Sequence, residues 1–395
     1  MKCRACNSSN IFNAIDMGLM PISNELSYDK SYSEKFELIM CICRDCGLGQ
    51  ISKDISNTRL FTNYTFASSV NEAFVSHAKK YSDDIIDKIG ITKDDWVLEI
   101  GSNDGYMLQH FNQRGISVLG IDPAINISKY AILNGIPTIQ DFFGEKLAVQ
   151  ILEKRGYPKL IIANNVFAHV PNIIDFAKGL KVLTNENTLI TIENPSIINI
   201  LVDHQVDTIY HEHYSYLSCL SVNNIMNSVG LNLFNLEKIP VTGGANRYWV
   251  SKNKPIDKII NDTIQEEISF GIINFEKWKI SELVIKEKIK KFSDRIDRSL
   301  KEGKNICGYA ASSKATVLLN LAGIKKDSIN CISDDGIDKQ GKYIPGVNIP
   351  IVSYEEMINS KPDEVIVFSW NIFDYLKNRI NSKNQDIKVW SWLDC

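Results

Sequence analysis

The sequence lacks both an excess of positive charge and a long apolar run. Its 44 lysine and arginine residues are outnumbered by 47 aspartate and glutamate residues, for a formal net charge of -3. Nucleic-acid-binding proteins usually carry a basic surplus, so this balance predicts no nucleic-acid partner. No run of about 18 apolar residues occurs, and the opening MKCRACNSSN contains no apolar core of signal-peptide length. We therefore expect a cytoplasmic protein that does not bind a membrane.

Nine cysteines in a reducing compartment are not expected to form a disulfide framework, so metal binding or burial must account for them. Four of them form two Cys-x-x-Cys pairs, Cys3 with Cys6 and Cys43 with Cys46, and each pair can turn two thiolates toward one ion. This spacing predicts a structural zinc ion, because four thiolates fill a tetrahedral shell. Plain burial is the alternative. We expect it for Cys41, Cys219, Cys307, Cys331 and Cys395.

The middle of the chain has the pattern of a parallel α/β fold. Apolar strands are predicted at residues 94–100 (DDWVLEI), 118–122 (VLGID), 159–164 (KLIIAN) and 188–193 (TLITIE), with helix-length stretches such as IIDFAKGLKVL between them. Strand and helix in alternation imply a doubly wound sheet. The ligand of such a sheet lies at the carboxyl ends of its strands.

The turn after the first of these strands runs from Glu99 to Gly105 and lacks the GxGxxG spacing of a dinucleotide fold. Its glycines, Gly101 and Gly105, let the backbone approach a ligand closely. Asp122, at the end of the second strand, can accept hydrogen bonds from the two ribose hydroxyls that both NAD and S-adenosylmethionine carry. Glu99 and Asp104 would repel a pyrophosphate, whereas they suit a sulfonium and its amino group. A surface turn that is N-capped by Asp104 is the alternative.

Three of the six histidines lie in one segment, DHQVDTIYHEHYSY at residues 203–216. Histidine titrates near neutral pH and can act as a general base. His211 and His213 are two residues apart, not four, so this is not the HExxH motif of a zinc protease. Tyr210 and His213 would point to opposite faces in a strand but meet in a helical turn, so we expect a turn or helix. Ordinary surface or buried histidines are the alternative, which we prefer for His77, His110 and His204.

The last third of the chain predicts a helical connector and a second α/β unit. Charged and apolar residues are mixed from about residue 256 to 302, as in an amphipathic helix that packs and connects. Strands are then expected at NICGYA, NCISD and DEVIVFSW, and a helix begins at SSKATVLLNLA. The first turn places Ser312, Ser313 and Lys314 at a helix N-terminus, which suits a phosphate group. Ordinary N-capping by serine is the alternative.

A series of motifs follows one another along the chain: VLEIGSNDGYML, VLGIDPAINISKYA, NGIPT, IIANNVFAHVPN and VDTIYHEHYSYLS. Together with the Cys-x-x-Cys pairs, GYAASSKATVLLN and KQGKYIPG, they resemble the pattern of sugar C-methyltransferases over nearly the whole chain. Enzymes of that family methylate a nucleotide-linked 4-keto-deoxysugar at carbon 3 in antibiotic and surface-polysaccharide pathways. The sequence departs from the family at GGANR (243–247) for a GGSLR-like turn, at SSKATVLL for AAKGNTLL, and at ENPS, where a histidine often follows the proline.

The resemblance implies S-adenosylmethionine and a structural zinc ion as cofactors, and it assigns the site residues. Those at the cofactor are Glu99, Gly101, Asn103, Asp104, Gly105, Asp122, Asp141, Phe142, Asn164 and Asn165. Those at the sugar are Tyr210, Glu212 and His213, with His213 as general base and with His169 and Tyr64 beside the reacting centre. Ser313, Lys314 and Tyr343 are assigned to the nucleotide-diphosphate-linked sugar.

The residue types in the histidine-rich segment agree with such chemistry. A carbon next to a ketone becomes nucleophilic when it loses a proton to give an enolate, and a neutral histidine can take that proton. Glu212 could orient an imidazole or balance its charge, and Tyr210 could donate a hydrogen bond to the oxyanion. Two alternatives stay open: O-methylation of a sugar hydroxyl, and a non-catalytic module that binds zinc and a nucleotide. The nucleotide, the sugar and the oligomeric state are not identified, although a monomer is compatible with the sequence.

Together these patterns predict an α/β protein in four parts. A small zinc-binding domain is expected at residues 1–60, and a doubly wound domain that binds S-adenosylmethionine at residues 61–255. A helical connector is expected at residues 256–302, and a Rossmann-like α/β domain that binds the nucleotide-sugar at residues 303–395.

Overall fold

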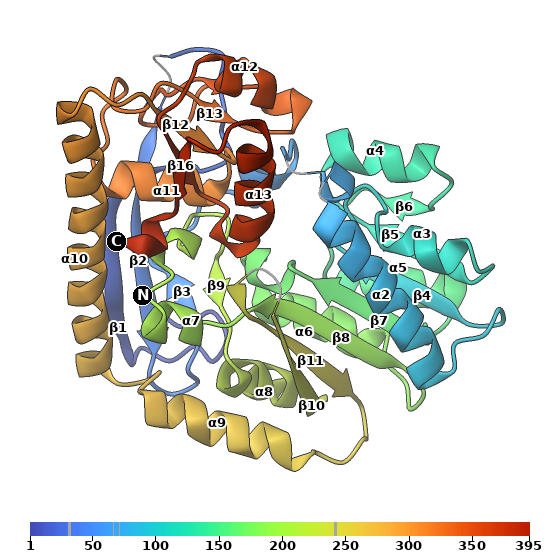
Figure 1. Cartoon of the computed structure of the whole chain (residues 1–395). Coiled ribbons are helices and arrows are strands. Elements are labelled where there is room, and N and C mark those ends of the chain that lie inside the picture. Colours follow the sequence, from blue (N-terminus) through green and yellow to red (C-terminus); the bar gives the residue numbers. More distant parts are fainter. Residues whose placement is uncertain (31–32, 66, 71, 241–242) are drawn as a thin grey trace.

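The computed structural model describes residues 1–30, 33–65, 67–70, 72–240 and 243–395. In this part of the chain the strands form three sheets, of four, seven and five strands (Figure 1). Helices accompany the seven-stranded and five-stranded sheets, which confirms the predicted α/β fold class.

The four-stranded sheet is an antiparallel meander that gains its last strand from a distant part of the chain. Its strands are β1 (Ile11–Pro21), β2 (Lys35–Cys43), β3 (Gly49–Ile51) and β9 (Ser215–Tyr216), and the short helix α1 (Asn57–Phe61) follows β3. β9 pairs with β3 through Gly49 opposite Tyr216 and Gln50 opposite Ser215. Because β9 closes the histidine-rich segment, this pairing attaches that segment to the amino-terminal sheet.

The seven-stranded sheet has the strand order β10-β11-β8-β7-β4-β5-β6. Five neighbouring strands are parallel, whereas β11 runs antiparallel to β8 and β10 antiparallel to β11. The strands are β4 (Trp96–Ile100), β5 (Ser117–Ile121), β6 (Thr138–Ile139), β7 (Leu160–Asn164), β8 (Leu189–Pro195), β10 (Asn232–Ile239) and β11 (Ala245–Ser251). The helices are α2 (Glu72–Ile89), α3 (Leu108–Asn112), α4 (Ile125–Leu133), α5 (Glu145–Arg155), α6 (Ile173–Val182), α7 (Ile198–Val202) and α8 (Cys219–Ser228).

Successive residues of the central strands enter different cores. In β4, Val97 packs with α2 and α3, whereas Leu98 belongs to the core that contains α5 and α6. In β7, Leu160 packs in the same core as Val97, and Ile161 packs in the same core as Leu98. Side chains of a strand alternate between faces, so each face of the sheet is covered by its own set of helices. The predicted doubly wound arrangement is therefore confirmed.

The five-stranded sheet is entirely parallel, with the order β14-β13-β12-β15-β16. Its strands are β12 (Ile306–Tyr309), β13 (Ile332–Ser333), β14 (Ile351–Val352), β15 (Glu364–Val367) and β16 (Lys388–Trp390). Its helices are α11 (Ser313–Leu321), α12 (Tyr354–Asn359) and α13 (Phe373–Lys383). We call this unit, residues 303–395, the carboxy-terminal lobe.

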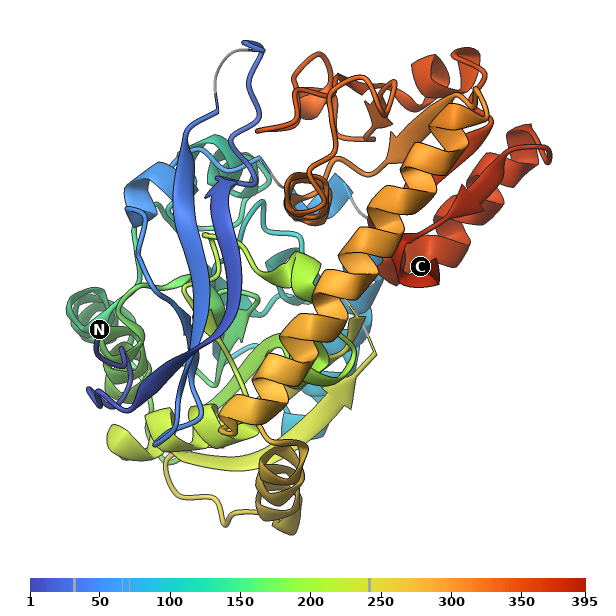
Figure 2. The same ribbon diagram turned by 90° about the vertical axis from the view of Figure 1, so that its left-hand side faces the viewer.

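Two helices fill the stretch where the sequence predicts an amphipathic connector: α9 (Lys258–Phe270) and α10 (Phe275–Lys301). They separate because Gly271 adopts a left-handed φ of 95° and Asn274 caps α10 by accepting hydrogen bonds from Glu276 N and Lys277 N. α10 crosses from the amino-terminal sheet to the carboxy-terminal lobe (Figure 2), and its buried apolar side chains belong to the core shared by both. Across the described residues, no helix has the length and apolar character that a membrane crossing requires.

Candidate active site

A cavity of about 2000 Å³ lies between the seven-stranded sheet and the carboxy-terminal lobe. Its walls include residues that follow the carboxyl ends of β4, β5, β7, β12 and β13, and α13 faces α4 across it (Figure 1). Parallel strands place their ligands at these ends. Pockets for one small ligand usually measure about 300–1000 Å³, so this cavity has room for two ligands side by side.

The turn between β4 and α3 brings the backbone close to one half of the cavity. Gly101 and Gly105 have φ values of 74° and 81°, in the left-handed region that glycine tolerates. A Cβ atom at Gly101 would lie 2.9 Å from the Cβ atom of Val166, which is too close for any larger residue. The sequence therefore needs glycine here for space as well as for backbone conformation.

Three carboxylates, Glu99, Asp104 and Asp122, surround this turn, and none forms an ion pair within the described residues. Asp122 accepts hydrogen bonds from Asn103 N and Ala124 N, both at 2.8 Å. Burial, together with the charges of Asp122 and Asp104, raises the pKa of Glu99 well above its usual value. One oxygen of Asp104 is buried without a partner. This set of acceptors fits a ligand with a positive charge and a ribose diol, and S-adenosylmethionine has both.

The residues assigned to the cofactor converge on this half of the cavity, with one exception. Its lining contains Gly101, Asn103, Asp104, Gly105, Asp122, Asp141, Phe142, Asn164 and Asn165. Glu99 is 1% exposed and lies behind this lining. The side chain of Glu99 therefore makes no direct contact with the cavity.

His213 lies in the wall of the same cavity, held by its backbone neighbours. Its Nδ1 atom lies 2.9 Å from the Thr208 carbonyl oxygen, which can only accept, so Nδ1 carries the proton and Nε2 carries the lone pair. The ring centroids of Tyr210 and His169 lie 4.1 Å and 4.9 Å from that of His213. Burial lowers the pKa of His213 well below its usual value and that of His169 to about 4, so both rings are neutral at neutral pH.

The predicted turn at the YHEH sequence is confirmed. Tyr210 and His213 meet through a hydrogen bond from His213 N to the Tyr210 carbonyl, at 3.0 Å, with the turn at residues 211–212 between them. His211 points elsewhere, since its Nε2 lies 3.4 Å from the Glu37 carbonyl and its ring packs against Phe36 at 6.1 Å. Of the two neighbouring histidines, the cavity lining contains His213 but not His211.

Glu212 is buried behind the cavity and contacts neither imidazole by hydrogen bond within the described residues. Its carboxylate accepts a hydrogen bond from Asn24 N at 3.2 Å, and burial raises its pKa to about 7. The group that orients the His213 ring is the Thr208 carbonyl. Tyr64, by contrast, lines the cavity, and burial and the charge of Glu212 raise the pKa of its phenol, which keeps the hydroxyl protonated.

The carboxy-terminal lobe supplies the other half of the cavity. Ser313 and Lys314, at the start of α11, line it, and Ser313 Oγ donates a hydrogen bond to Asn24 Oδ1 at 3.1 Å. Tyr343 does not line this cavity. It forms an antiparallel bridge with Ser27, to whose carbonyl its N–H donates at 2.9 Å.

The four paired cysteines come together away from the cavity. The sulfur atoms of Cys3, Cys6, Cys43 and Cys46 all lie within 4.8 Å of one another, with Sγ to Sγ distances of 3.5 Å and 3.6 Å for two of the pairs. A tetrahedral zinc ion with bonds of about 2.3 Å requires sulfur atoms about 3.8 Å apart, so the cluster fits zinc. Cys41 lies apart, with its sulfur on Asn13 Oδ1 at 3.3 Å.

Comparisons with known proteins agree with this geometry. Three family models match the chain: a zinc binding domain at residues 3–61, a methyltransferase domain at residues 74–236 and a C-methyltransferase C-terminal domain at residues 240–391. The C-methyltransferase NovU of Streptomyces niveus is 29% identical over 376 residues, which cover 94% of this chain and 90% of NovU. The chain is an S-adenosylmethionine-dependent methyltransferase whose three parts match the domains of a C-methyltransferase.

Solved structures resemble this methyltransferase less closely. The PH0226 protein from Pyrococcus horikoshii OT3 is 10% identical, with 50% of this chain and 98% of that chain covered and a TM-score of 0.38. Magnesium protoporphyrin IX methyltransferase from Synechocystis PCC 6803, with bound S-adenosylmethionine, is 12% identical. The match covers 50% of this chain and 90% of that chain, with a TM-score of 0.34. At this level of similarity neither structure bears on the chemistry.

Several residues that the sequence did not single out line the part of the methyltransferase cavity that the carboxy-terminal lobe supplies. Asp334 and Asp335 follow β13 and line the cavity. Asp334 forms an ion pair with Lys339 at 3.1 Å, and Asp335 forms one with Arg379 at 2.7 Å. The signal for the two aspartates was present, since NCISDD ends a strand in an acid as VLGID does. Arg379 lies on α13, 44 residues from its partner, and no local pattern marks it.

Proposed function

We propose that this methyltransferase acts on a nucleoside-diphosphate-linked 4-keto-deoxysugar, and that it methylates carbon 3 through an enolate during deoxysugar or surface-polysaccharide biosynthesis. The observation that carries the proposal is the Nε2 atom of His213, which has no protein partner within the described residues and belongs to a side chain that lines the cavity. When bound, S-adenosylmethionine supplies an electrophilic methyl group. NovU, the relative at 29% identity, is a C-methyltransferase, which favours carbon as the acceptor.

His213 has the properties that a base for carbon acids needs. The Thr208 carbonyl holds its proton on Nδ1, so the lone pair of Nε2 is directed away from the backbone. Burial lowers the pKa of His213, so the ring is neutral at neutral pH and its Nε2 lone pair is unprotonated. Positioned general bases contribute about 10²- to 10⁴-fold to rate.

Phenols near His213 can stabilise the enolate oxygen. Burial raises the pKa of Tyr210 and of Tyr64 above that of an ordinary phenol, so both hydroxyls stay protonated and can donate. Phe61 lies against His169 and Tyr64, with ring centroids 5.4 Å and 6.0 Å apart. This apolar wall limits access of water, and hydrogen bonds to a developing charge are strongest where water is excluded.

A sugar with a nucleotide attached suits the second half of the cavity. The lobe places the N-terminus of α11 and the carboxyl ends of β12 and β13 against it. Helix N-termini favour phosphate groups, and acids that end parallel strands suit ribose hydroxyls. In this proposal Ser313 contacts the diphosphate and Asp334 or Asp335 the ribose. Glu212, whose carboxylate contacts Asn24 N, supports the segment that meets Ser313.

Solvent exchange separates this function from its main alternative, O-methylation with His213 as base. The protein is incubated in deuterated water, without S-adenosylmethionine, with thymidine diphosphate-linked 4-keto-6-deoxyglucose and its uridine, cytidine and guanosine counterparts. Deuterium incorporation at carbon 3, followed by proton NMR, is the expected result. Methyl transfer to a sugar hydroxyl without any exchange would establish O-methylation, and failure to bind S-adenosylmethionine would leave only a binding module.

A further inference from the structure

Lys314 presents a cation to the cavity without a protein anion to neutralise it directly. Its half-buried side chain lines the cavity that contains His213 and Tyr210, and no hydrogen bond or ion pair within 4.0 Å holds its ammonium in the described part of the chain. Lys339 and Arg379, which line the same cavity, are both engaged in ion pairs. A partly buried ammonium is costly unless it is paired, so the position of Lys314 calls for an anionic group on the ligand.

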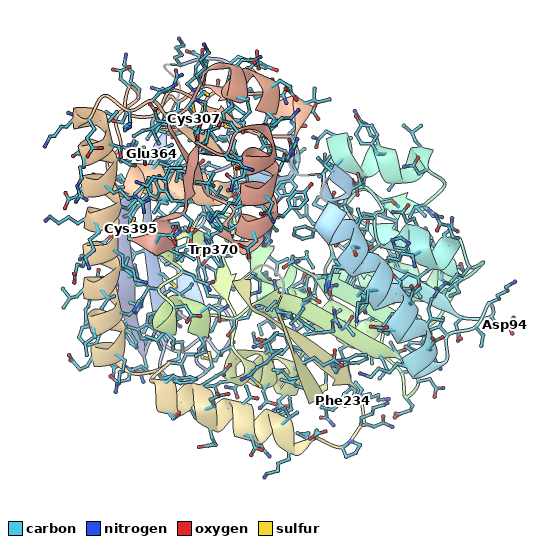
Figure 3. All side chains as sticks on the ribbon, viewed as in Figure 1. Asp94, Phe234, Cys307, Glu364, Trp370 and Cys395 are labelled. Carbon is cyan, nitrogen blue, oxygen red and sulfur yellow. The ribbon has the colours of Figure 1, made fainter. Side chains whose placement is uncertain are left out.

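The surroundings of Lys314 connect it to the proposed base. Its Nζ atom lies 5.8 Å from the ring centroid of Trp370. Trp370 Nε1 donates a hydrogen bond at 2.7 Å to the Asp207 carboxylate, which also accepts from Trp392 Nε1 at 3.1 Å. Trp370 lies on the side of the carboxy-terminal lobe that faces the centre of the molecule (Figure 3). The residue after Asp207 is Thr208, whose carbonyl holds His213, so the lysine and the base share one support.

Lys314 could bind either the diphosphate or the enolate oxygen of the substrate, and the charge of Asp207 favours one of these anions over the other. Asp207 is fully buried, and one of its oxygens has no partner within the described residues. Burial lowers the pKa of Lys314, and the charge of Asp207 opposes that shift only in part. Asp207 therefore offsets part of the charge of the ammonium without a direct ion pair between these two described residues. A diphosphate keeps its charge throughout and would face the Asp207 carboxylate permanently. An enolate oxygen acquires charge only during reaction, and a single ammonium is enough to balance it.

We propose that Lys314 is a further catalytic residue, whose ammonium contacts the ketone oxygen of the substrate and balances the charge of the enolate, and that Asp207 is its positioning residue. This inference rests on the proposed function. In the step concerned, the C–H bond at carbon 3 breaks and its proton goes to Nε2 of His213. The electron pair of that bond forms the new double bond between carbons 3 and 4, and the carbonyl pair moves to the oxygen beside Lys314.

Exchange and affinity, measured on the same variants, test this role. Lys314→Met should lower deuterium exchange at carbon 3 of saturating thymidine diphosphate-linked 4-keto-6-deoxyglucose, or of whichever counterpart the wild type exchanges, by about 10²- to 10³-fold, the usual loss for one oxyanion-stabilising group. The dissociation constant of that nucleotide-sugar, measured by calorimetry, should change by less than about 3-fold. Lys314→Arg keeps the charge and should recover part of the exchange. Unchanged S-adenosylmethionine affinity and thermal melting would show that the variants are folded.

Other outcomes overturn the inference. A weakened nucleotide-sugar affinity with normal exchange at saturation would assign Lys314 to the diphosphate. Normal affinity and exchange would remove it from the site. If the wild-type protein exchanges no probe while it methylates a sugar hydroxyl, the proposed function fails and the role of Lys314 falls with it.

Asp207 is tested as a positioning residue by comparison with Trp392. Asp207→Asn removes the charge, and Trp392→Phe removes only one donor to it. Both variants disturb the same buried contact, so a purely structural role predicts similar melting and similar exchange for the two. The positioning role predicts that Asp207→Asn lowers kcat for exchange about 10-fold with little change in KM, while Trp392→Phe, which keeps the charge and the Trp370 hydrogen bond, loses clearly less. Equal loss in both would refute it.

Discussion

Replacement of His213 by asparagine tests the proposed base with little change to its support. An asparagine amide can place an N–H near the position of Nδ1 and keep the hydrogen bond to the Thr208 carbonyl, 2.9 Å away in the wild type. It has no atom at the position of Nε2 and cannot accept a proton at neutral pH. The substitution therefore removes the base and retains its anchor.

The expected magnitudes separate a loss of chemistry from a loss of packing. Loss of the base should lower turnover about 10²- to 10⁴-fold, equivalent to about 3 to 5 kcal/mol of activation free energy. Loss of the ring contacts with Tyr210 and His169 should cost about 0.5 to 1.5 kcal/mol of folding free energy for each pair. The catalytic effect should therefore exceed anything that partial unfolding of a stable protein produces.

His211→Asn is the matched control, because His211 makes comparable buried contacts with Phe36 and the Glu37 carbonyl but does not line the cavity. Methyl transfer and solvent exchange are measured for both variants, with calorimetry for S-adenosylmethionine binding. We expect the His213 variant to bind the cofactor and fail at both reactions, and the His211 variant to perform both. Greater damage from His211→Asn, or normal exchange in His213→Asn, would refute the assignment and make His169 the next candidate.

Three further predictions concern the metal, the cofactor and the pH dependence of stability. Cys43→Ser should cost far more folding stability than activity per folded molecule, and metal analysis that finds no stoichiometric zinc in the wild type would rule out the site. Asp122→Ala should weaken S-adenosylmethionine binding, with about 1.5 to 3 kcal/mol lost for each charge-assisted hydrogen bond; unchanged affinity by calorimetry would contradict the ribose contact. Burial raises the pKa of Glu212 from 4.5 to about 7, so the folded protein binds this proton more tightly than the unfolded chain does. The protonated carboxyl therefore stabilises the folded state at low pH, and this stabilisation is lost as the pH rises from 4.5 to 7. The unfolding free energy of the wild type should therefore fall relative to Glu212→Gln by about 3 kcal/mol between pH 4.5 and 7.5, and parallel pH profiles of the two proteins would show that the carboxyl is not held in this way.

Local patterns in the sequence were enough to predict the central sheet and the turn between β4 and α3. Strand ends, glycines and terminal acids are adjacent in sequence there, so Gly101 and Asp122 could be placed by spacing alone. The turn at Tyr210 and His213 follows from the same kind of argument, since its two ends are three residues apart.

The remaining features depend on contacts between distant parts of the chain. The first helix of the connector ends at Gly271. A single glycine also occurs inside helices, so the sequence alone does not show that a helix ends there. The partner of Glu212 is a backbone N–H at Asn24, 188 residues away, and the donors to Asp207 are indoles 163 and 185 residues away. Spacing rules cannot reveal such pairs, because they are set by how three sheets pack and not by periodicity.

The segment that carries His213 is held from two sides, and this explains why a zinc-binding module belongs to the catalytic unit. Cys43 and Cys46 close the turn between β2 and β3, and β3 pairs with β9, which begins two residues after His213. On the other side, Asp207 receives two indole hydrogen bonds from the carboxy-terminal lobe. A short irregular segment has few hydrogen bonds of its own, so its geometry must come from such neighbours. A zinc ion at the four cysteines would stabilise the turn before β3, the strand that holds one end of the segment through β9. The carboxy-terminal lobe holds the other end through its two hydrogen bonds to Asp207.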